Sequence, residues 1–365
     1  MSKIISIAKA LPPYRHAQME VCGFMKEAYG LDGDERRKLD YLYRHSGIDF
    51  RYSVIPDYSP SLGKREFYSR TISQCPSPSL ETRMEWFHTH ALPLSLKACR
   101  KCLRGHISPK EVTHLVTVSC TGLSAPGLDI SIVEHLKLPT STIRTSLNFM
   151  GCYGALHALK MADAFCRADR GARVLVVCTE LCTLHFQKEY NADHATSGLL
   201  FADGSAAALV TAGSYPGPGL MMESFWSDLL LTGKKDMTWE LSDRGFQMRL
   251  SAYIPRLVSE GIGPLLNHAL LQLRLTPKNI THWAIHPGGK KILEAVRDRL
   301  GLDDHALDHS FRVLKQYGNM SSPTILFVLE SVWKGLLPRS QNRIFAAAFG
   351  PGLTLESLIL LPRSR

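Results

Sequence analysis

The run Arg173-Val-Leu-Val-Val-Cys178 is apolar at every position after its arginine and shows no alternation with polar residues. Such a run is typical of a strand in a sheet that is buried on both faces, with helices packed against each face. Two similar runs stand before and after it, His114-Leu-Val-Thr-Val-Ser119 and Ala206-Ala-Ala-Leu-Val-Thr211. The sequence therefore predicts an α/β fold with a covered sheet.

The pieces of the first half of the chain recur in the same order in the second half. Each half has an apolar strand pattern, a Gly-containing pair that opens a helical pattern, and two further strand patterns. In the first half these pieces are residues 114–119, Gly151-Cys152 with Leu156, Leu159, Ala162 and Phe165, residues 173–178 and residues 206–211. In the second half they are residues 282–286, Gly318-Asn319 with Ile325, Val328 and Leu329, residues 343–348 and residues 353–360.

This repetition predicts a duplicated fold, with residues 1–213 as the N-terminal half and residues 214–365 as the C-terminal half. If a pseudo-two-fold axis relates the halves, five layers are expected in the order helix, sheet, helix, sheet, helix (αβαβα). The two helix starts, at Cys152 and at Asn319, then meet near the axis, and the strand end at His286 lies beside them. A functional site is expected where the halves meet.

The composition of the 365 residues excludes several classes of protein. Apolar residues make up 45% and charged residues 21% of the chain, which excludes a disordered, collagen-like or coiled-coil protein. The formal charge of +10 favours anionic partners, but no nucleic-acid-binding signature accompanies it, so no nucleic acid is expected. The longest charge-free stretch, residues 204–222, is interrupted by Ser, Gly and Pro, so no membrane span is expected.

The N-terminus and the cysteines favour a cytoplasmic protein with reduced thiols. The first residues place a very short apolar run between lysines and lack a small-residue cleavage signal, unlike a secretory leader. The nine cysteines are odd in number and scattered, several of them in apolar runs, and one of them is Cys75.

No metal or cofactor motif stands out in the sequence. Cys99 and Cys102 with His106 resemble half of a zinc site, but no second pair follows at ligand spacing, so an amphipathic helix and no metal are expected. No GxGxxG pattern follows a strand and no Walker-type phosphate loop occurs, so neither a nicotinamide nor a nucleoside triphosphate is expected.

Cys152 occupies a position that suits a nucleophile. It lies between glycines at the start of a predicted helix, where free N–H groups and the helix dipole stabilise a thiolate. A buried, inert cysteine is the alternative. His286 closes an apolar strand and could equally be a core residue, and Asn319 could be an ordinary N-cap. Together, a nucleophile, a histidine able to stabilise its thiolate and an amide donor for an oxyanion form a site for acyl transfer or carbon–carbon bond formation.

Five blocks resemble the signature blocks of the type III polyketide synthases, the chalcone synthase-like family. They stand in the family's order, and the similarity covers most of the chain from about residue 110 onward, with a looser match before it. The blocks are Gly151-Cys152, Gly171-Ala-Arg-Val-Leu-Val-Val-Cys178, Ile285-His286-Pro-Gly-Gly289, Tyr317-Gly-Asn-Met-Ser-Ser322 and Phe349-Gly-Pro-Gly-Leu-Thr354.

The resemblance implies a thiolase fold, a homodimer and a triad of Cys152, His286 and Asn319. In this family the cysteine is acylated by a CoA-linked starter. The histidine and asparagine bind the thioester carbonyl of malonyl-CoA and stabilise the enolate formed on loss of carbon dioxide. Acyl-CoA and malonyl-CoA are substrates, and no metal or other cofactor is implied. Repeated rounds give a poly-β-keto chain that cyclises in the same cavity.

The resemblance also assigns the substrate pocket. Phe201 matches one gatekeeper phenylalanine of the family, and Met248, a more pliable side chain, stands at the second. Cys120 and Cys182 replace two threonines of the plant cavity, a combination that resembles bacterial members, and Trp239 stands where plant enzymes carry a small residue. Ser321 of the Asn319 block is a further pocket residue. The cyclisation loop is matched by Phe349, Gly350, Pro351 and Gly352, with Ala348 in place of the usual first glycine.

CoA binding requires cations at the mouth of a tunnel. Lys38 matches a CoA-contact position of the family, while the neighbouring arginine and lysine of the family become Tyr41 and His45. The alternative for each basic residue is a solvated surface charge. The expected substitutes are Arg44, Arg51, or Lys290 and Lys291. Gly288 and Gly289, in the turn before these lysines, are also assigned to CoA binding.

The expected activity is iterative decarboxylative condensation of malonyl-CoA onto an acyl-CoA starter held by Cys152. A fatty acyl-CoA starter giving alkylpyrones or alkylresorcinols is favoured because Met248 can admit a flexible chain. The alternatives are a synthase of small aromatic polyketides from malonyl-CoA alone, a ketoacyl synthase III-like enzyme that makes one condensation, and a non-catalytic acyl-CoA-binding subunit. The presence of all three triad residue types argues against the last.

Overall fold

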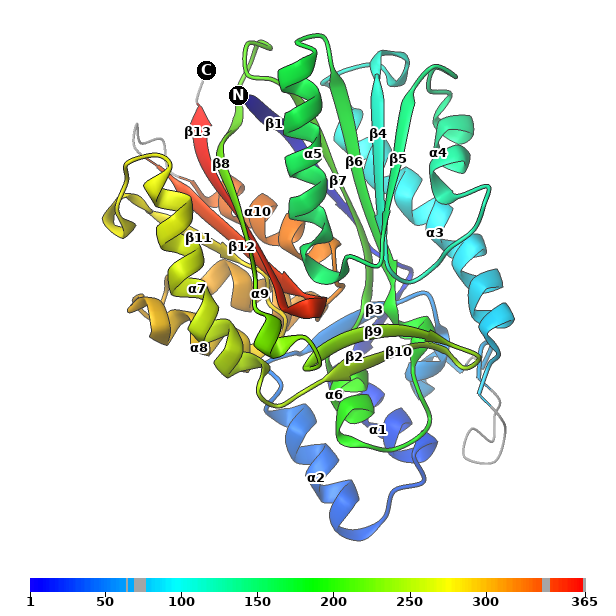
Figure 1. Ribbon diagram of the computed structural model, residues 1–365. Helices are drawn as coiled ribbons and strands as arrows, with labels where there is room; N and C mark the ends of the chain where they lie inside the picture. Colours follow the sequence, from blue (N-terminus) through cyan, green and yellow to red (C-terminus); the bar gives the residue numbers. More distant parts are fainter. Residues whose placement is uncertain (64, 69–76, 337–341, 364–365) are drawn as a thin grey trace.

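The computed structural model in Figure 1 describes residues 1–63, 65–68, 77–336 and 342–363, so Cys75 lies outside the described residues. Its main sheet has the strand order β11-β12-β13-β8-β1-β7-β6-β4-β5. The strands are β1 (Ser2–Ala10), β4 (His114–Ser119), β5 (Ile143–Asn148), β6 (Arg173–Leu181), β7 (Asp203–Ala212), β8 (Gly219–Leu229), β11 (His282–Ile285), β12 (Ile344–Gly350) and β13 (Thr354–Arg363). The strands predicted from apolar runs are all present.

The central strands are buried on both faces, as their composition predicts. Along β6, Leu175 and Val177 pack into one apolar core, while Val174, Val176 and Cys178 pack into a second core on the opposite face. Successive side chains of a strand point to opposite faces, so an uninterrupted apolar run is what two cores require.

Helices form layers on both sides of the sheet and between its two parts (Figure 1). The central layer is α5 (Gly154–Ala168) with α10 (Pro323–Gly335). One outer layer holds α3 (Leu80–Leu103) and α4 (Leu128–Leu136), and the other holds α7 (Ile254–Leu271) and α8 (Lys290–Leu300). The α/β class and the αβαβα layering are confirmed.

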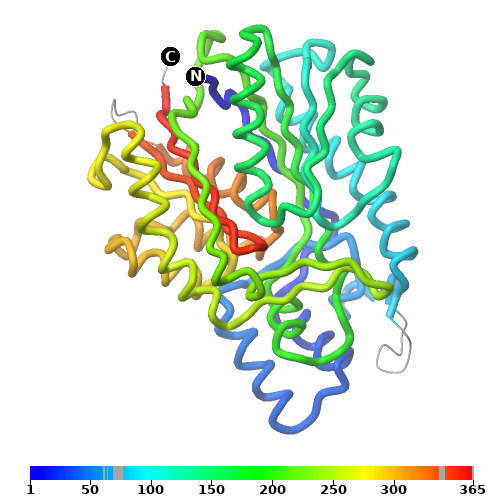
Figure 2. Tube along the Cα trace, in the orientation of Figure 1, coloured from blue at the N-terminus to red at the C-terminus, as the bar shows by residue number. Residues whose placement is uncertain are grey.

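The two parts of the sheet are continuous with each other. Strand β1 of the N-terminal half pairs with β8 of the C-terminal half through Lys3 with Met221 and Ile4 with Leu220. Figure 2 shows the two chain termini at the same end of this sheet. The proposed division at residues 213/214 falls in the connection between β7 and β8.

The opposite end of the sheet is closed by smaller elements (Figure 1). These are β2 (Tyr14–Ala17), α1 (Gln18–Ala28), α2 (Gly33–Arg44), β3 (Phe50–Ser53), α6 (Ala192–Leu200), and the hairpin of β9 (Met237–Ser242) with β10 (Gly245–Leu250); α9 (Asp308–Tyr317) packs against α10 and β3. The N-terminal end of α5 and the carboxyl end of β6 point toward this closure.

One expectation about helix starts needs correction. Asn319 does not open a helix, because α10 begins four residues later at Pro323 and Asn319 instead forms a β-bridge with Phe201. Cys152 lies in a short 3-10 turn, η4 (Gly151–Tyr153), directly before α5. The predicted helix that contains Cys99 and Cys102 is confirmed as part of α3, where both thiols are buried. In the described part of the chain, no helix is both long and apolar enough to cross a membrane.

Candidate active site

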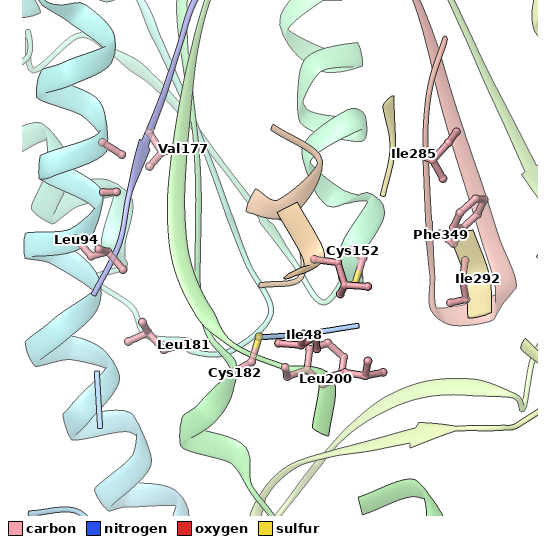
Figure 3. Packing of buried hydrophobic residues seen from close by; sticks show 14 of the residues in the cluster. Ile48, Leu94, Cys152, Val177, Leu181, Cys182, Leu200, Ile285, Ile292 and Phe349 are labelled. Carbon is pink, nitrogen blue, oxygen red and sulfur yellow. The ribbon is translucent and has the colours of Figure 1, made fainter. Parts of the chain in front are cut away.

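The structure brings Cys152, His286 and Asn319 to one cavity. Cys152 comes from the turn before α5, His286 follows β11 directly, and Asn319 lies in the loop between α9 and α10. All three side chains are buried and line the same cavity. In the view of Figure 3, Cys152 lies between Cys182 of the N-terminal half and Phe349 of the C-terminal half.

The turn that carries Cys152 depends on Gly151. This residue has a φ of +76°, and a Cβ atom there would lie 2.3 Å from Cδ of Pro351. A side chain would therefore meet both backbone strain and a direct clash. The glycine lets the Cys152 turn approach the Pro351 loop of the other half, and this approach closes the cavity around the sulfur.

The carboxamide of Asn319 is held by its own loop and by the turn after β11. Its Oδ1 accepts a hydrogen bond from the main-chain N–H of Ser321 at 2.8 Å, and its Nδ2 donates to the carbonyl of Gly288 at 3.4 Å. The main-chain N–H of Asn319 donates to the carbonyl of Leu200 at 2.9 Å. These contacts fix the side chain with an amide donor at the cavity.

His286 presents an imidazole without a partner. The residue is 1% exposed, and within the described ranges both ring nitrogens are buried and make no hydrogen bond. Burial lowers the pKa of the imidazole to about 3, so the ring is neutral at pH 7. A buried polar group without a partner is costly, and such a group at a cavity wall fits a partner that a substrate supplies.

The Cys152 thiol lies in a desolvated environment. Burial raises the pKa of the thiol to about 12, and hydrogen bonds to Ser321 and Asn319 oppose this rise only in part. The Sγ lies 3.6 Å from Oγ of Ser321. The expectation that the helix start stabilises a thiolate stays a prediction, because desolvation opposes the local dipole. A thiol with a raised pKa becomes a nucleophile only after it loses its proton to a base.

Glu180 is a buried carboxylate next to this site that the sequence analysis missed. It accepts hydrogen bonds from the main-chain N–H of Cys120 at 2.9 Å and from the hydroxyls of Thr121 and Ser322, each at 2.8 Å. Burial raises its pKa to about 7 against these donors. In the sequence, the feature that could have identified Glu180 is an acidic residue near the end of the apolar strand β6. Glu180 joins the end of β4 to the segment before α10, and so links the surroundings of Cys152 and Asn319.

The six residues assigned to the substrate pocket all line the cavity. They are Cys120, Cys182, Phe201, Trp239, Met248 and Ser321. Trp239 and Met248 are directly opposite each other in the β9–β10 hairpin, and Nε1 of Trp239 donates to the carbonyl of Cys120 at 2.7 Å. This bond fastens the hairpin to the end of β4 and makes it one wall of the cavity.

Comparison with known proteins identifies the family. Residues 1–214 match the pattern "Chalcone and stilbene synthases, N-terminal domain", and residues 221–363 match the corresponding C-terminal domain. The chain belongs to the chalcone and stilbene synthase family. It is therefore a type III polyketide synthase, a condensing enzyme of the acyltransferase type, and the substrates of this family are CoA thioesters.

Similar proteins occur in several lineages. The "Alpha-pyrone synthesis polyketide synthase-like Pks18" of Mycobacterium tuberculosis is 32% identical over 336 residues, which cover 90% of this chain and 83% of that protein. PKS-I from the brown alga Ectocarpus siliculosus has a TM-score of 0.93 at 28% identity, covering 99% of this chain and 98% of that one. The C-terminal type III domain of Steely1 from Dictyostelium has a TM-score of 0.89 at 27% identity, covering 99% of each chain. The fold is thus the thiolase-like fold of type III polyketide synthases.

The cyclisation loop of this polyketide synthase is only partly at the cavity surface. Phe349 and Pro351 line the cavity, whereas Gly350 and Gly352 are not among its lining residues. A Cβ atom on Gly350 would lie 2.5 Å from Cδ1 of Tyr153, so this glycine permits close packing against the Cys152 turn. The two glycines therefore support the loop, while Phe349 and Pro351 shape the cavity.

The residues assigned to CoA are spread over α2 and α8. Gly288 lines the cavity, and Gly289 faces Leu200 from the residue before α8. The side chains of Lys38, Arg44, Lys290 and Lys291 are exposed, and none of them lines the cavity. Carbon atoms of Lys290 lie within 3.3 to 3.6 Å of the Cβ position of Gly47, which places the start of α8 beside the turn after α2.

Arg51 lines the cavity from a buried position. It is 4% exposed, and its Nη1 donates to the carbonyls of Gly198 and Phe201. Its expected role as a substitute cation for the CoA phosphates stays a prediction, because tertiary packing directs the guanidinium into the protein while Nε and Nη2 make no hydrogen bond in the described part of the chain. Other residues that the sequence analysis missed, among them His16, Tyr58, His185 and Met237, also line the cavity.

Proposed function

We propose that this enzyme loads an acyl group from a CoA thioester onto Cys152 and extends it with units from malonyl-CoA. The observation that carries the proposal is the buried, unpartnered imidazole of His286 in one cavity with the carboxamide of Asn319 and the thiol of Cys152. Neutral donors that are preorganised around a developing oxyanion, away from water, lower the barrier to forming that charge.

Each residue has a distinct part in the proposed cycle. The Cys152 sulfur attacks the starter thioester, its proton passes to His286, and CoA leaves with that proton. In malonyl-CoA, the bond between the carboxylate and the methylene carbon breaks, carbon dioxide leaves, and the electron pair forms an enolate. His286 and Asn319 donate hydrogen bonds to the enolate oxygen. The enolate carbon then attacks the acyl carbonyl on Cys152, and the cysteine leaves as a thiolate.

We further propose a fatty acyl-CoA starter and alkylpyrone or alkylresorcinol products that cyclise in the same cavity. Support comes from the apolar side chains of the wall, including Met248, and from the relative named for alpha-pyrone synthesis. The presence of Cys120 and Cys182 in the wall supports a pocket of the bacterial type. Because its substrates are made inside the cell, we place the enzyme in the cytoplasm.

A homodimer is the proposed assembly. Strand β5 is an edge strand of the main sheet, and an edge strand presents free main-chain groups for pairing. Ile143 at its start is 55% exposed, and Leu123 and Ile130 nearby in the chain are also exposed. We propose that a second copy of the chain covers this edge. Sedimentation of the Ile143→Lys variant, compared with the unmodified protein, tests this assembly. The variant should dissociate into monomers, and an unchanged mass would contradict the proposal.

Incubation with malonyl-CoA and a series of saturated acyl-CoA starters, followed by mass spectrometry, tests the proposed activity. The expected products retain the acyl chain of the starter and are longer by several two-carbon units. One added unit would indicate a ketoacyl synthase III-like enzyme. The same product whatever the starter would indicate a synthase that uses malonyl-CoA alone. No release of carbon dioxide would indicate a non-catalytic acyl-CoA-binding subunit.

A further inference from the structure

The C-terminal end of α6 is held largely from outside the helix, apart from the carbonyl of Ser197, which accepts from the N–H of Phe201 at 3.1 Å. The last turn of a helix leaves carbonyl groups without partners inside the helix. The next four carbonyls, three in α6 and the fourth on its C-cap residue Phe201, each meet a donor from another segment. Gly198 and Phe201 accept from Nη1 of Arg51 at 2.7 Å each, Leu199 accepts from Nε2 of Gln18 at 3.0 Å, and Leu200 accepts from the main-chain N–H of Asn319 at 2.9 Å.

Arg51 carries a buried charge that this helix end compensates. Within the described part of the chain, its Nη1 donates to main-chain carbonyls, no carboxylate is among its partners, and its Nε and Nη2 make no hydrogen bond. A buried cation without a compensating group is strongly unfavourable. The C-terminal end of a helix carries a partial negative charge, which stabilises a cation placed against its free carbonyls. The position of Arg51 and the position of the last turn of α6 therefore depend on each other.

Two residues of the active site are attached to the same turn. Phe201 follows α6 directly and forms a β-bridge with Asn319, and the N–H of Ala202 donates to the carbonyl of Asn319 at 2.9 Å. The side chain of Arg51 also packs under Gly318, whose φ is +69° and whose Cβ position lies 3.0 Å from Cγ of Arg51. A shift of Arg51 would thus move the main chain of both Phe201 and Asn319.

We propose that Arg51, assisted by Gln18, is a positioning residue that sets Phe201 and Asn319 relative to Cys152. The inference rests on the role of Asn319 in the proposed function. The inference predicts that Arg51 affects one step of the cycle. The decarboxylation step, which needs the Asn319 amide at the enolate oxygen, depends on Arg51. The reactivity of the Cys152 thiol toward a small alkylating agent does not, because the turn before α5 holds that residue.

The test compares Arg51→Met and Arg51→Lys with the matched control Arg15→Met. Arg15 lies on the neighbouring strand β2, is exposed, and has its guanidinium carbon 3.4 Å from the ring centre of Phe50, away from α6. For each protein, release of carbon dioxide from malonyl-CoA, alkylation of Cys152 by iodoacetamide and thermal unfolding are measured. A lysine amine can donate to both carbonyls that Arg51 serves, whereas methionine can donate to neither.

We expect Arg51→Met to lower kcat for decarboxylation at least about tenfold, since small misplacements of catalytic groups cost up to about a hundredfold. KM for malonyl-CoA and the alkylation rate should stay within about twofold of the unmodified enzyme. Arg51→Lys should recover most of kcat, and Arg15→Met should behave as the unmodified enzyme. A raised KM with unchanged kcat in Arg51→Met would overturn the inference in favour of a CoA contact.

A folded Arg51→Met variant with the same kcat as the unmodified enzyme would also overturn the inference. So would a variant in which the rate of Cys152 alkylation falls together with kcat. If Arg51→Met does not fold, Gln18→Leu takes its place, and a kcat reduced severalfold with normal alkylation is expected; unchanged kcat in that variant would count against the inference. An unmodified enzyme that releases no carbon dioxide would refute the proposed function itself, whatever the variants do.

Discussion

At the scale of single residues, the pKa of the Cys152 thiol differs from the lowered pKa expected of an activated cysteine. Because burial raises its pKa to about 12, only a small fraction is thiolate near neutral pH. We expect the rate of alkylation by iodoacetamide to rise about tenfold per pH unit from pH 7 to pH 10, without a plateau, since the thiolate is the reactive form. Mass spectrometry of the Cys152 peptide measures this rate.

A control for this prediction is Ser321→Ala, which removes a hydrogen bond that lowers the pKa of the Cys152 thiol. The variant should be alkylated more slowly than the unmodified enzyme at each pH. A plateau near neutral pH in the unmodified enzyme would indicate a thiolate paired with a protonated His286. That result is incompatible with an imidazole whose pKa burial lowers to about 3.

At the scale of elements, the turn η4 is the tightest point of the site. Gly151→Ala introduces a Cβ 2.3 Å from Cδ of Pro351 at a φ of +76°. The matched control is Gly105→Ala, where φ is +78° and no heavy atom lies within 4 Å of the Cβ position. We expect Gly105→Ala to lower the free energy of unfolding by about 1 kcal/mol from backbone strain. Gly151→Ala should lower it by about 1–3 kcal/mol more from overpacking, as chemical denaturation would measure.

The activity of the two alanine variants should differ as well. Gly151→Ala displaces the Cys152 turn from the Pro351 loop, so loss of product formation is expected, whereas Gly105→Ala should retain activity. Equal destabilisation of the two variants would show that the contact between η4 and the Pro351 loop is looser than the structure indicates.

Local sequence patterns predicted the helices and strands more accurately than they predicted the tertiary contacts between them. The strand β6 follows from its apolar run, and the expected neighbourhood of Cys152, His286 and Asn319 follows from the repeated order of pieces. Asn319 does not start a helix because its loop pairs with Phe201, a contact from another part of the chain that no local spacing contains. Arg51 looks like a surface cation in the sequence, and only the packing of α6 against β3 buries it. The catalytic roles of the triad stay a prediction.

At the scale of the whole molecule, a charged cluster joins the two halves between α5 and β13. Glu356 lies within 3.3 Å of the Lys160 amine and within 3.5 Å of the His157 ring. Burial alone would raise the pKa of Glu356, but hydrogen bonds to His157 and Ser227 and the charge of Lys160 outweigh it and lower the pKa below its usual value. This cluster therefore stabilises the folded protein when Glu356 is ionised.

The pH dependence of stability has a definite sign for this cluster. A carboxyl with a lowered pKa in the folded state adds stability above its unfolded value of about 4.5, and that stability is lost as the pH falls through the folded pKa. Glu356→Gln should thus be less stable than the unmodified enzyme at pH 7, and the difference should shrink as the pH falls below 4.5. Denaturant unfolding at a series of pH values measures it, and a difference that grows on acidification would contradict the account.

The most direct test of the central claim measures carbon dioxide release and product formation together in Cys152→Ala, Asn319→Ala and the unmodified enzyme. We expect Cys152→Ala still to release carbon dioxide from malonyl-CoA but to form no extended product, because His286 and Asn319 remain while the acyl acceptor is gone. Asn319→Ala should lose both. Extended product from Cys152→Ala, or undiminished carbon dioxide release from Asn319→Ala, would contradict the assignment of the site.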